Sequence, residues 1–408
     1  PAFAQQTYIQ CGRLIDGKSN LVQTEMTIIV ESNKIIDVRK GYQSGAVSDK
    51  LINMRNQTVM PGFIDSHVHL SGETSKNQYM EEFTLNDEDY ALKAVKYSER
   101  TLMAGFTTVR DLGGFVAVSL RNAINSGDIK GPRILAAGKS IATTGGHADP
   151  SNGYSRALIG DPEAKDGVVN SPEEARKAVR QRYKESSDVI KITATGGVLS
   201  NAKDGAGAQF TEDEIKAVVS TAKDYGYRVA AHAHGAEGMK RAIRAGVSSI
   251  EHGTFMDDEV IALMKENGTY YVPTITAGKS VADSAKIPGY YPPLVVPKAI
   301  ATGPKIQSTF AKAYKAGVKI AFGTDAGVFA HGKNYKEFEY MLEAGMPAME
   351  AIKSATMGAA DLLGISDRVG SIEKGKSADI IAVNGDPIKD IKVLSSMNFV
   401  MKEGVVYK

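Results

Sequence analysis

Eight apolar, β-rich runs alternate with helical patterns through the middle of the chain, and this alternation restricts the fold more than any other feature. One intervening helix is expected over 211–226, where Thr211 and Glu214 form a Thr-x-x-Glu capping box. Eight strands alternating with helices match the element count of a (β/α)8 barrel. The eight runs lie at 58–67, 107–113, 133–139, 188–197, 227–235, 248–253, 269–275 and 318–327.

Both ends of the chain lack this alternation and read as short strands. Residues 7 to about 55 and the tail from about 370 are rich in Ile and Val, with Gly, Ser and Asn between the runs. We expect the two ends to pair into a discontinuous β domain of residues 1–57 and 366–408, with the barrel domain, 58–365, inserted between them. A chain of 408 residues is long enough for both. The stretches at about 141–170 and 276–297 are expected as long loops that cover the barrel mouth.

Composition excludes several classes of partner. The formal charge of +2 and the absence of a long basic run argue against a nucleic-acid partner. No apolar stretch reaches the roughly 18 residues of a membrane span. A single cysteine, Cys11, excludes an internal disulfide framework and a cysteine-rich metal site, so any metal must be held by nitrogen and oxygen. Monomer and homo-oligomer both stay open.

The N-terminus carries one localisation signal. Ala2-Phe3-Ala4 followed by Gln5 is similar to a signal-peptidase site without its preceding hydrophobic region. This triplet predicts a periplasmic or secreted protein, and a chance triplet in a cytoplasmic protein is the alternative.

All the histidines fall at the ends of the β-rich runs or in the loops that follow them. His67 and His69 close the first run, and because side chains alternate along a strand, both would point the same way. Active sites of (β/α)8 barrels lie at the C-terminal ends of the strands. Two converging imidazoles there predict half of a metal site, and two satisfied or solvent-facing histidines are the alternative. The seven histidines are His67, His69, His147, His232, His234, His252 and His331.

Other polar residues close the later strands. Lys191 lies inside the apolar run Val189–Ile192, and Asp325 follows the eighth run. A buried lysine is costly unless it is neutralised or used. A lysine amine that reacts with carbon dioxide becomes a carbamate, whose two oxygens can bridge two metals; a salt-bridged lysine is the alternative. Arg110 and Asp111, at the end of the second run, are expected to form a structural ion pair beneath the site.

This constellation resembles the amidohydrolase superfamily, and within it the imidazolonepropionase-like branch, over nearly the whole chain. The resemblance is carried by PGFIDSHVHL, TTVRDLGG, TTGGH, KITATGG, AHAHGAEGMKRAIRAGVSSIEHG, GTDAG and GSIEKGKSADIIAVNGDP. It implies that the terminal strands form the β-sandwich that flanks the barrel in this superfamily. It also implies two divalent metal ions, with zinc favoured and manganese or cobalt as alternatives. The implied ligands are His67, His69, carboxylated Lys191 and Asp325 for one metal, and Lys191, His232 and His252 for the other.

The resemblance further implies a hydrolase of peptide-like amides that uses a hydroxide bridging the two metals. Asp325 would take the proton of the hydroxide and pass it to the leaving amine. His147, in the loop after the third strand, would stabilise the oxyanion or hold the substrate carbonyl. A structural hydrogen bond within the loop is the alternative for His147.

The expected substrate is a dipeptide or short peptide cut at its last bond, with a C-terminal arginine or lysine. His234, and after it His331, are candidates to hold the terminal carboxylate, and Glu73 or Asp204 would face the cationic side chain. An Xaa-Pro dipeptidase is the first alternative, although proline-cleaving relatives look to carry tyrosine at the position of His234. A hydrolase of cyclic amides is the second. A non-catalytic scaffold is disfavoured because all six expected ligands are present.

Overall fold

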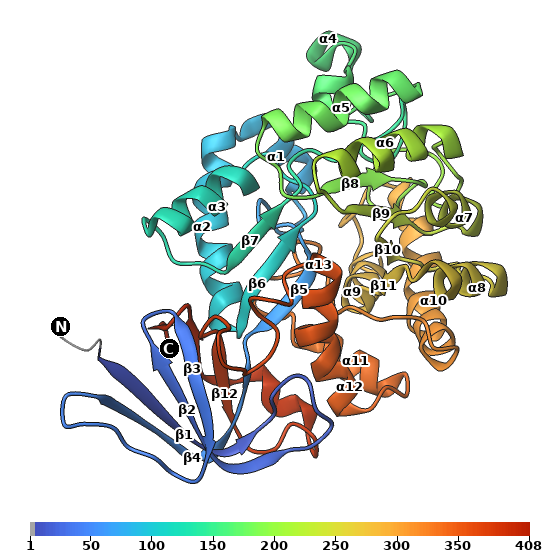
Figure 1. Ribbon diagram of the computed structural model, residues 1–408. Helices are drawn as coiled ribbons and strands as arrows, with labels where there is room; N and C mark the ends of the chain where they lie inside the picture. The colour runs from blue at the N-terminus through green and yellow to red at the C-terminus, as the bar shows by residue number, and fades with distance from the viewer. Residues whose placement is uncertain (1–4) are drawn as a thin grey trace.

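The computed structural model describes residues 5–408, which build a barrel and a sheet made from both ends of the chain (Figure 1). The triplet Ala2-Phe3-Ala4 lies outside the described residues. In Figure 1 the blue N-terminal strands lie beside the red C-terminal strand β12, which places the two ends of the sequence in one layer.

Seven strands form the terminal sheet, in the order β14-β13-β12-β4-β1-β2-β3. Strand β1 is antiparallel to β2 and parallel to β4, and β4 is antiparallel to β12, so chain segments from both termini meet at β4. The strands share an apolar cluster that includes Ile9, Cys11, Ile28 and Ile380. Their bounds are β1 Gln6–Leu14, β2 Gln23–Glu31, β3 Lys34–Lys40, β4 Lys50–Pro61, β12 Ile380–Asn384, β13 Met397–Lys402 and β14 Val405–Val406.

The first run expected for the barrel is divided between the two parts of the molecule. Residues 58–61 belong to β4 of the terminal sheet, and the barrel begins with β5, Phe63–Val68. Gly62 separates them, and a Cβ on Gly62 would lie 2.1 Å from Oγ1 of Thr107. The chain therefore passes from sheet to barrel where only glycine fits. Because β4 runs across residue 57, the expected domain limits stay a prediction.

Parallel strands build the barrel in two hydrogen-bonded groups, β5-β6-β7 and β8-β9-β10-β11. A parallel bridge between Ile141 and Ile192 joins the groups. The eighth expected strand, 318–327, is irregular: it closes the barrel through the bridges Tyr271–Ile320 and Val68–Ala326. The other barrel strands are β6 Phe106–Asp111, β7 Arg133–Ala136, β8 Ile190–Thr193, β9 Val229–Ala233, β10 Ser249–His252 and β11 Tyr270–Val272.

Helices cover the outside of the barrel (Figure 1). The expected helix over 211–226 is α6, whose capping box between Thr211 and Glu214 is formed, and its residues Ile215, Val218 and Ala222 are buried. The barrel helices are α1 Gln78–Thr84, α2 Asp87–Met103, α3 Ala117–Ser126, α4 Arg156–Ile159, α5 Pro172–Lys184, α6 Glu212–Asp224, α7 Ala236–Arg244, α8 Asp258–Asn267, α9 Ile275–Ser284, α10 Val295–Lys315, α11 Lys336–Glu343, α12 Ala348–Lys353 and α13 Ala359–Leu363.

The prediction of a loop over 276–297 is wrong for its first part, because α9 occupies residues 275–284. Helix α9 packs against α10 at small residues: a Cβ on Gly303 would lie 2.3 Å from Cβ of Ala282. Close packing against α10 therefore stabilises α9. In residues 5–408 no helix combines the length and the apolar character that crossing a membrane requires.

Candidate metal centre and active site

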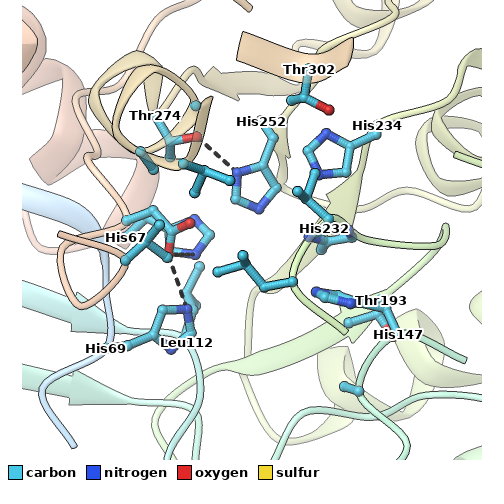
Figure 2. Close-up of a pocket in the computed structure, with 18 of the residues that line it drawn as sticks. His67, His69, Leu112, His147, Thr193, His232, His234, His252, Thr274 and Thr302 are labelled. Carbon is cyan, nitrogen blue, oxygen red and sulfur yellow. Dashed lines mark hydrogen bonds and ion pairs between the residues drawn. The ribbon is translucent and has the colours of Figure 1, made fainter. Parts of the chain in front are cut away.

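A cavity of about 280 Å³ lies at the C-terminal ends of the barrel strands (Figure 2). It has a polar side, where imidazole rings converge, and an apolar side. The polar side includes the six expected metal ligands and two further histidines: His67, His69, Lys191, His232, His252 and Asp325, with His147 and His234.

Strand alternation explains how most of these side chains reach the cavity. His67 is near the end of β5, Lys191 is in β8 and His232 is in β9, and all three are nearly fully buried. Side chains of one parity along a barrel strand point inward, so residues from three different strands meet near the barrel axis.

His67, His69 and Asp325 have the spacing of three ligands to one metal ion. Nε2 of His67 and Nε2 of His69 lie 3.5 and 3.2 Å from Oδ1 of Asp325. Ligand atoms bound to one tetrahedral zinc at about 2.1 Å lie about 3.4 Å apart. Nε2 of His67 and Oδ1 of Asp325 are buried and have no hydrogen-bond partner among residues 5–408. Buried polar atoms are rarely left unpaired, so the geometry fits a cation shared by the three side chains.

The electrostatics of the cavity keep most of its imidazoles neutral, whereas at His69 burial is outweighed by the hydrogen bond and charge of Asp325, which raise the pKa of that imidazole. Burial and the nearby Lys191 lower the pKa of His67 to about 4. Burial, assisted by neighbouring histidines, also lowers the pKa values of His232 and His252 well below the usual range. Burial opposes the charge of Asp325, but His67 and His69 outweigh it and lower the pKa of that carboxyl. Neutral imidazoles and an ionised carboxylate are the forms that bind metal.

Lys191 is shifted toward its neutral form. Burial lowers its pKa to about 8, against the opposing attraction of Glu251 and Asp325. The neutral amine is the form that attacks carbon dioxide, so the burial of Lys191 favours carbamate formation.

Three residues that line the cavity have a left-handed backbone although none is glycine. The φ angles are 70° for His252, 51° for Thr274 and 60° for Asp325. This conformation is costly, most of all for a β-branched residue, and such strain concentrates at functional sites. Glu251 points into the barrel, so simple alternation would turn His252 outward. The left-handed turn at His252 instead directs its ring to the cavity (Figure 2).

The polar network beneath the expected ligands corrects one prediction. Arg110 pairs with Glu251, Nη2 to Oε1 at 2.9 Å, rather than with Asp111. Asp111 instead accepts hydrogen bonds from the backbone N–H groups of Leu70 and Gly113. Neighbouring residues in a strand point to opposite faces, which is why Arg110 and Asp111 cannot share one pair.

Sequence reasoning missed two buried acids that support the ligands. Glu251 contacts Nδ1 of His67 at 2.9 Å. Asp65 accepts hydrogen bonds from the backbone N–H of His67 and from Nδ2 of Asn334 at 2.7 Å. Asp65 lies two residues before His67 in the same strand, so alternation could have placed it on the inward face.

His147 lies over the ring of His232, with centroids 4.3 Å apart. Burial, with the nearby His234 as the next cause, lowers the pKa of His147 to about 3. Its Nδ1 is buried and has no partner among residues 5–408. A Cβ on Gly197 would lie 2.2 Å from this atom, so the ring occupies space that the glycine leaves.

The four residues expected to bind substrate separate into two groups. His234 lines the cavity, and its Nδ1 contacts Oγ1 of Thr254 at 2.8 Å. His331, Glu73 and Asp204 are not among the residues that line the cavity.

Each of these three outer residues has hydrogen-bond partners outside the cavity: His331 and Glu73 lie in two loops that contact each other, and Asp204 bonds to its own loop. Nε2 of His331 contacts the carbonyl of Gly72 at 2.9 Å. Glu73 accepts the backbone N–H of His331, and Asp204 accepts those of Ala206 and Gly207. Their roles in binding substrate stay a prediction.

The side of the cavity away from the imidazoles is apolar. Among the described lining residues Asp325 is the one acid, and it already faces His67 and His69. The apolar side includes Ala148, Val198, Leu199, Ala277, Val281, Ile306 and Val328, whereas the apolar Leu112 lies beside His69 (Figure 2).

The chain belongs to the amidohydrolase family, whose model matches residues 58–408. It is therefore a hydrolase of the superfamily that the sequence motifs indicated, with the barrel and terminal sheet of that fold.

Three known proteins are similar over nearly the whole chain. A crystal structure of a Xaa-Pro dipeptidase with methionine bound in its active site is 57% identical, with a TM-score of 0.97, and the match covers 99% of this chain and 100% of that one. A prolidase complexed with N-methylphosphonate-L-proline is 30% identical, with a TM-score of 0.90 and coverage of 99% and 100%. Ochratoxinase of Aspergillus niger is 32% identical, over 99% of this chain and 87% of the relative. These similarities favour the Xaa-Pro alternative over a carboxypeptidase specific for arginine or lysine.

Proposed function

We propose that this protein is a metal-dependent dipeptidase that cleaves Xaa-Pro and other dipeptides with an uncharged C-terminal residue. The observation that carries the proposal is the cavity itself. Unpaired ligand atoms of His67 and Asp325 meet on one side, and an apolar surface without a free acid lies on the other. The similar Xaa-Pro dipeptidase, with methionine in its active site, supports this choice of C-terminal residue.

Two divalent ions, with zinc favoured, would be held by the six ligands named above. His67, His69 and Asp325 would hold one, and Lys191 as its carbamate would complete both ligand sets together with His232 and His252. Divalent metal there polarises the scissile carbonyl and lowers the pKa of the attacking water.

The residues of the chain would position the peptide and move its proton. Asp325 accepts the proton of the attacking water and donates it to the leaving nitrogen, which a tertiary amide such as Xaa-Pro cannot release without protonation. His147 donates a hydrogen bond to the carbonyl oxygen as negative charge develops there. His234 holds the terminal carboxylate, and the apolar side of the cavity packs against the C-terminal side chain.

The test is a comparison of kcat/KM for Ala-Pro, Ala-Met, Ala-Arg and Ala-Glu. We expect the charged C-terminal residues to lose about 100-fold or more, because burying an unpaired charge costs several kcal/mol. Turnover of Ala-Arg equal to that of Ala-Pro would instead support a carboxypeptidase that prefers C-terminal arginine or lysine. If no peptide with a free C-terminus is cleaved, the cyclic-amide alternative gains support.

A gain-of-function variant sharpens this test. Leu199 lines the cavity and is only half-buried. Leu199→Asp therefore places a carboxylate in the cavity while leaving it partly in contact with water. We expect the ratio of Ala-Arg to Ala-Pro turnover to rise. Leu199→Asn, of the same size but uncharged, is the control and should leave Ala-Arg disfavoured.

A further inference from the structure

Glu251 is a fully buried carboxylate directly behind a predicted metal ligand. It lies in β10 and is 0% exposed. Its Oε2 contacts Nδ1 of His67 at 2.9 Å, and its Oε1 accepts hydrogen bonds from Nη2 of Arg110 and from Oγ of Ser249. Both carboxylate oxygens therefore have donors, and neither lies in the lining of the cavity.

The buried guanidinium of Arg110 keeps this carboxylate ionised and fixed in place. Besides Glu251, Arg110 donates from Nε to the carbonyl of Ser66 at 2.6 Å and from Nη1 to Oγ of Ser249 at 3.2 Å. Such a rigid fork, in which each of the three nitrogens donates a hydrogen bond, neutralises the charge of Glu251 and leaves it one orientation.

An ionised carboxylate only accepts hydrogen bonds, so Nδ1 of His67 must carry the proton. The lone pair of the ring is then on Nε2, the atom that faces Asp325 at 3.5 Å and has no other partner among residues 5–408. In the other tautomer the proton is on Nε2. The lone pair of Nδ1 would then face a lone pair of the Glu251 carboxylate, and Nε2 would have no lone pair to bind a cation.

His67 differs in this respect from the other expected histidine ligands, whose second nitrogens contact neutral oxygens. Nδ1 of His69 contacts the carbonyl of Gly113, Nε2 of His232 that of Gly196, and Nδ1 of His252 the hydroxyl of Thr274. A carboxylate behind an imidazole raises its basicity as a ligand more than a neutral oxygen does.

We propose that Glu251, held by Arg110, is a positioning residue that locks His67 into the tautomer whose Nε2 binds metal. The inference rests on the metal centre of the proposed function. It predicts that Glu251→Gln weakens metal binding although the residue touches neither metal nor substrate.

The test measures metal binding without turnover. We expect the dissociation constant for zinc, from competition with a chromophoric chelator, to rise about 10- to 100-fold in Glu251→Gln. In metal-free protein labelled with ¹⁵N-histidine, the native His67 should show a protonated Nδ1, and the variant should show a mixture of tautomers. His67→Asn identifies the signals. An unchanged dissociation constant with an unchanged Nδ1 signal would overturn the proposal.

A double variant keeps the proposal testable if Glu251→Gln, which leaves the charge of Arg110 unpaired, does not fold. Arg110→Gln/Glu251→Gln replaces the ion pair by two neutral amides, and we expect the same loss of zinc affinity and the same mixture of tautomers. Native affinity in the folded double variant would reject the proposal. Glu214→Gln is the control, since Glu214 is a buried glutamate of the α6 capping box that does not line the cavity.

The outcome is independent of the substrate. If native protein binds zinc with a protonated Nδ1 on His67 but cleaves no dipeptide, the proposed function fails and the role of Glu251 stands. If dipeptides are cleaved while Glu251→Gln binds zinc as tightly as native protein, the role of Glu251 fails and the proposed function stands.

Discussion

Nδ1 of His252 contacts Oγ1 of Thr274 at 2.8 Å, and both residues have a left-handed backbone. The hydrogen bond joins the ends of two adjacent strands, β10 and β11, at the points where each chain leaves the barrel. Each strained residue thus positions the other. At His252 this backbone conformation turns inward an imidazole that strand alternation would turn away.

Removing the hydroxyl of Thr274 tests this relationship. Thr274→Val keeps the shape but leaves the His252 ring without its partner, so we expect a loss of about 1–3 kcal/mol in unfolding free energy. Zinc affinity should fall about tenfold. Thr269→Val is the matched control, because Thr269 is also buried but its hydroxyl contacts only a backbone carbonyl, at 3.4 Å. Native zinc affinity in Thr274→Val would show that the hydrogen bond does not orient the ring.

Two divalent metals per chain are expected from the six converging ligands. Elemental analysis of reconstituted protein should give close to two equivalents, and a chelator should abolish turnover and lower Tm, because ligands that bind only the folded state stabilise it. A reproducible maximum of one equivalent at full activity would exclude the second metal.

Lys191 is expected to carry a carbamate. A crystal structure of metal-loaded protein should show a branched extension on Nζ. Lys191→Ala should lose turnover, and short carboxylic acids should restore part of it by replacing the missing oxygens. An unmodified ammonium on Lys191 in a metal-loaded crystal would contradict this prediction.

Asp325→Asn keeps the size of the side chain and removes its capacity to accept a proton. We expect kcat to fall about 10²- to 10⁴-fold, the usual contribution of general acid–base catalysis. Circular dichroism should show that the fold persists. An active variant would assign proton transfer to another residue.

Gly197→Ala tests His147 without changing the histidine. The new Cβ would lie 2.2 Å from the imidazole and push it from its place over His232. We expect kcat to fall about 100-fold, as for loss of an oxyanion donor. In the control, Gly72→Ala, the added Cβ meets nothing within 4 Å. If Gly197→Ala and Gly72→Ala are equally active, His147 does not act on the carbonyl.

The sequence predicts the strand ends and the residues placed there by alternation, such as His67 and Lys191. It does not predict His252 from alternation, because a single left-handed residue reverses the direction of its side chain. The pair of Arg110 and Glu251 joins strands far apart in the chain, and no local pattern reports it. Irregular closure by residues 318–326 and the helix α9 likewise depend on packing against neighbours rather than on their own composition.

Specificity was the least predictable part of the site. The positions of Glu73 and Asp204, after strands with expected ligands, predict contact with substrate, yet the carboxylate of each accepts hydrogen bonds from backbone N–H groups nearby. The apolar side of the cavity comes from several separate segments of the chain, and single apolar residues such as Ile306 and Val328 carry no signal in a sequence.

The position of β4 affects the order in which parts of the protein fold during synthesis. β4 continues through Gly62 into β5, which carries His67, and its partner on one side is β12, residues 380–384. While the ribosome makes the first 379 residues, that edge of β4 has nothing to pair with. Contacts so distant in sequence form slowly. β4 is thus paired on both sides only after residues 380–384 have been made, so the junction through which β4 leads into β5 should be among the last parts of the fold to become fixed on a newly made chain.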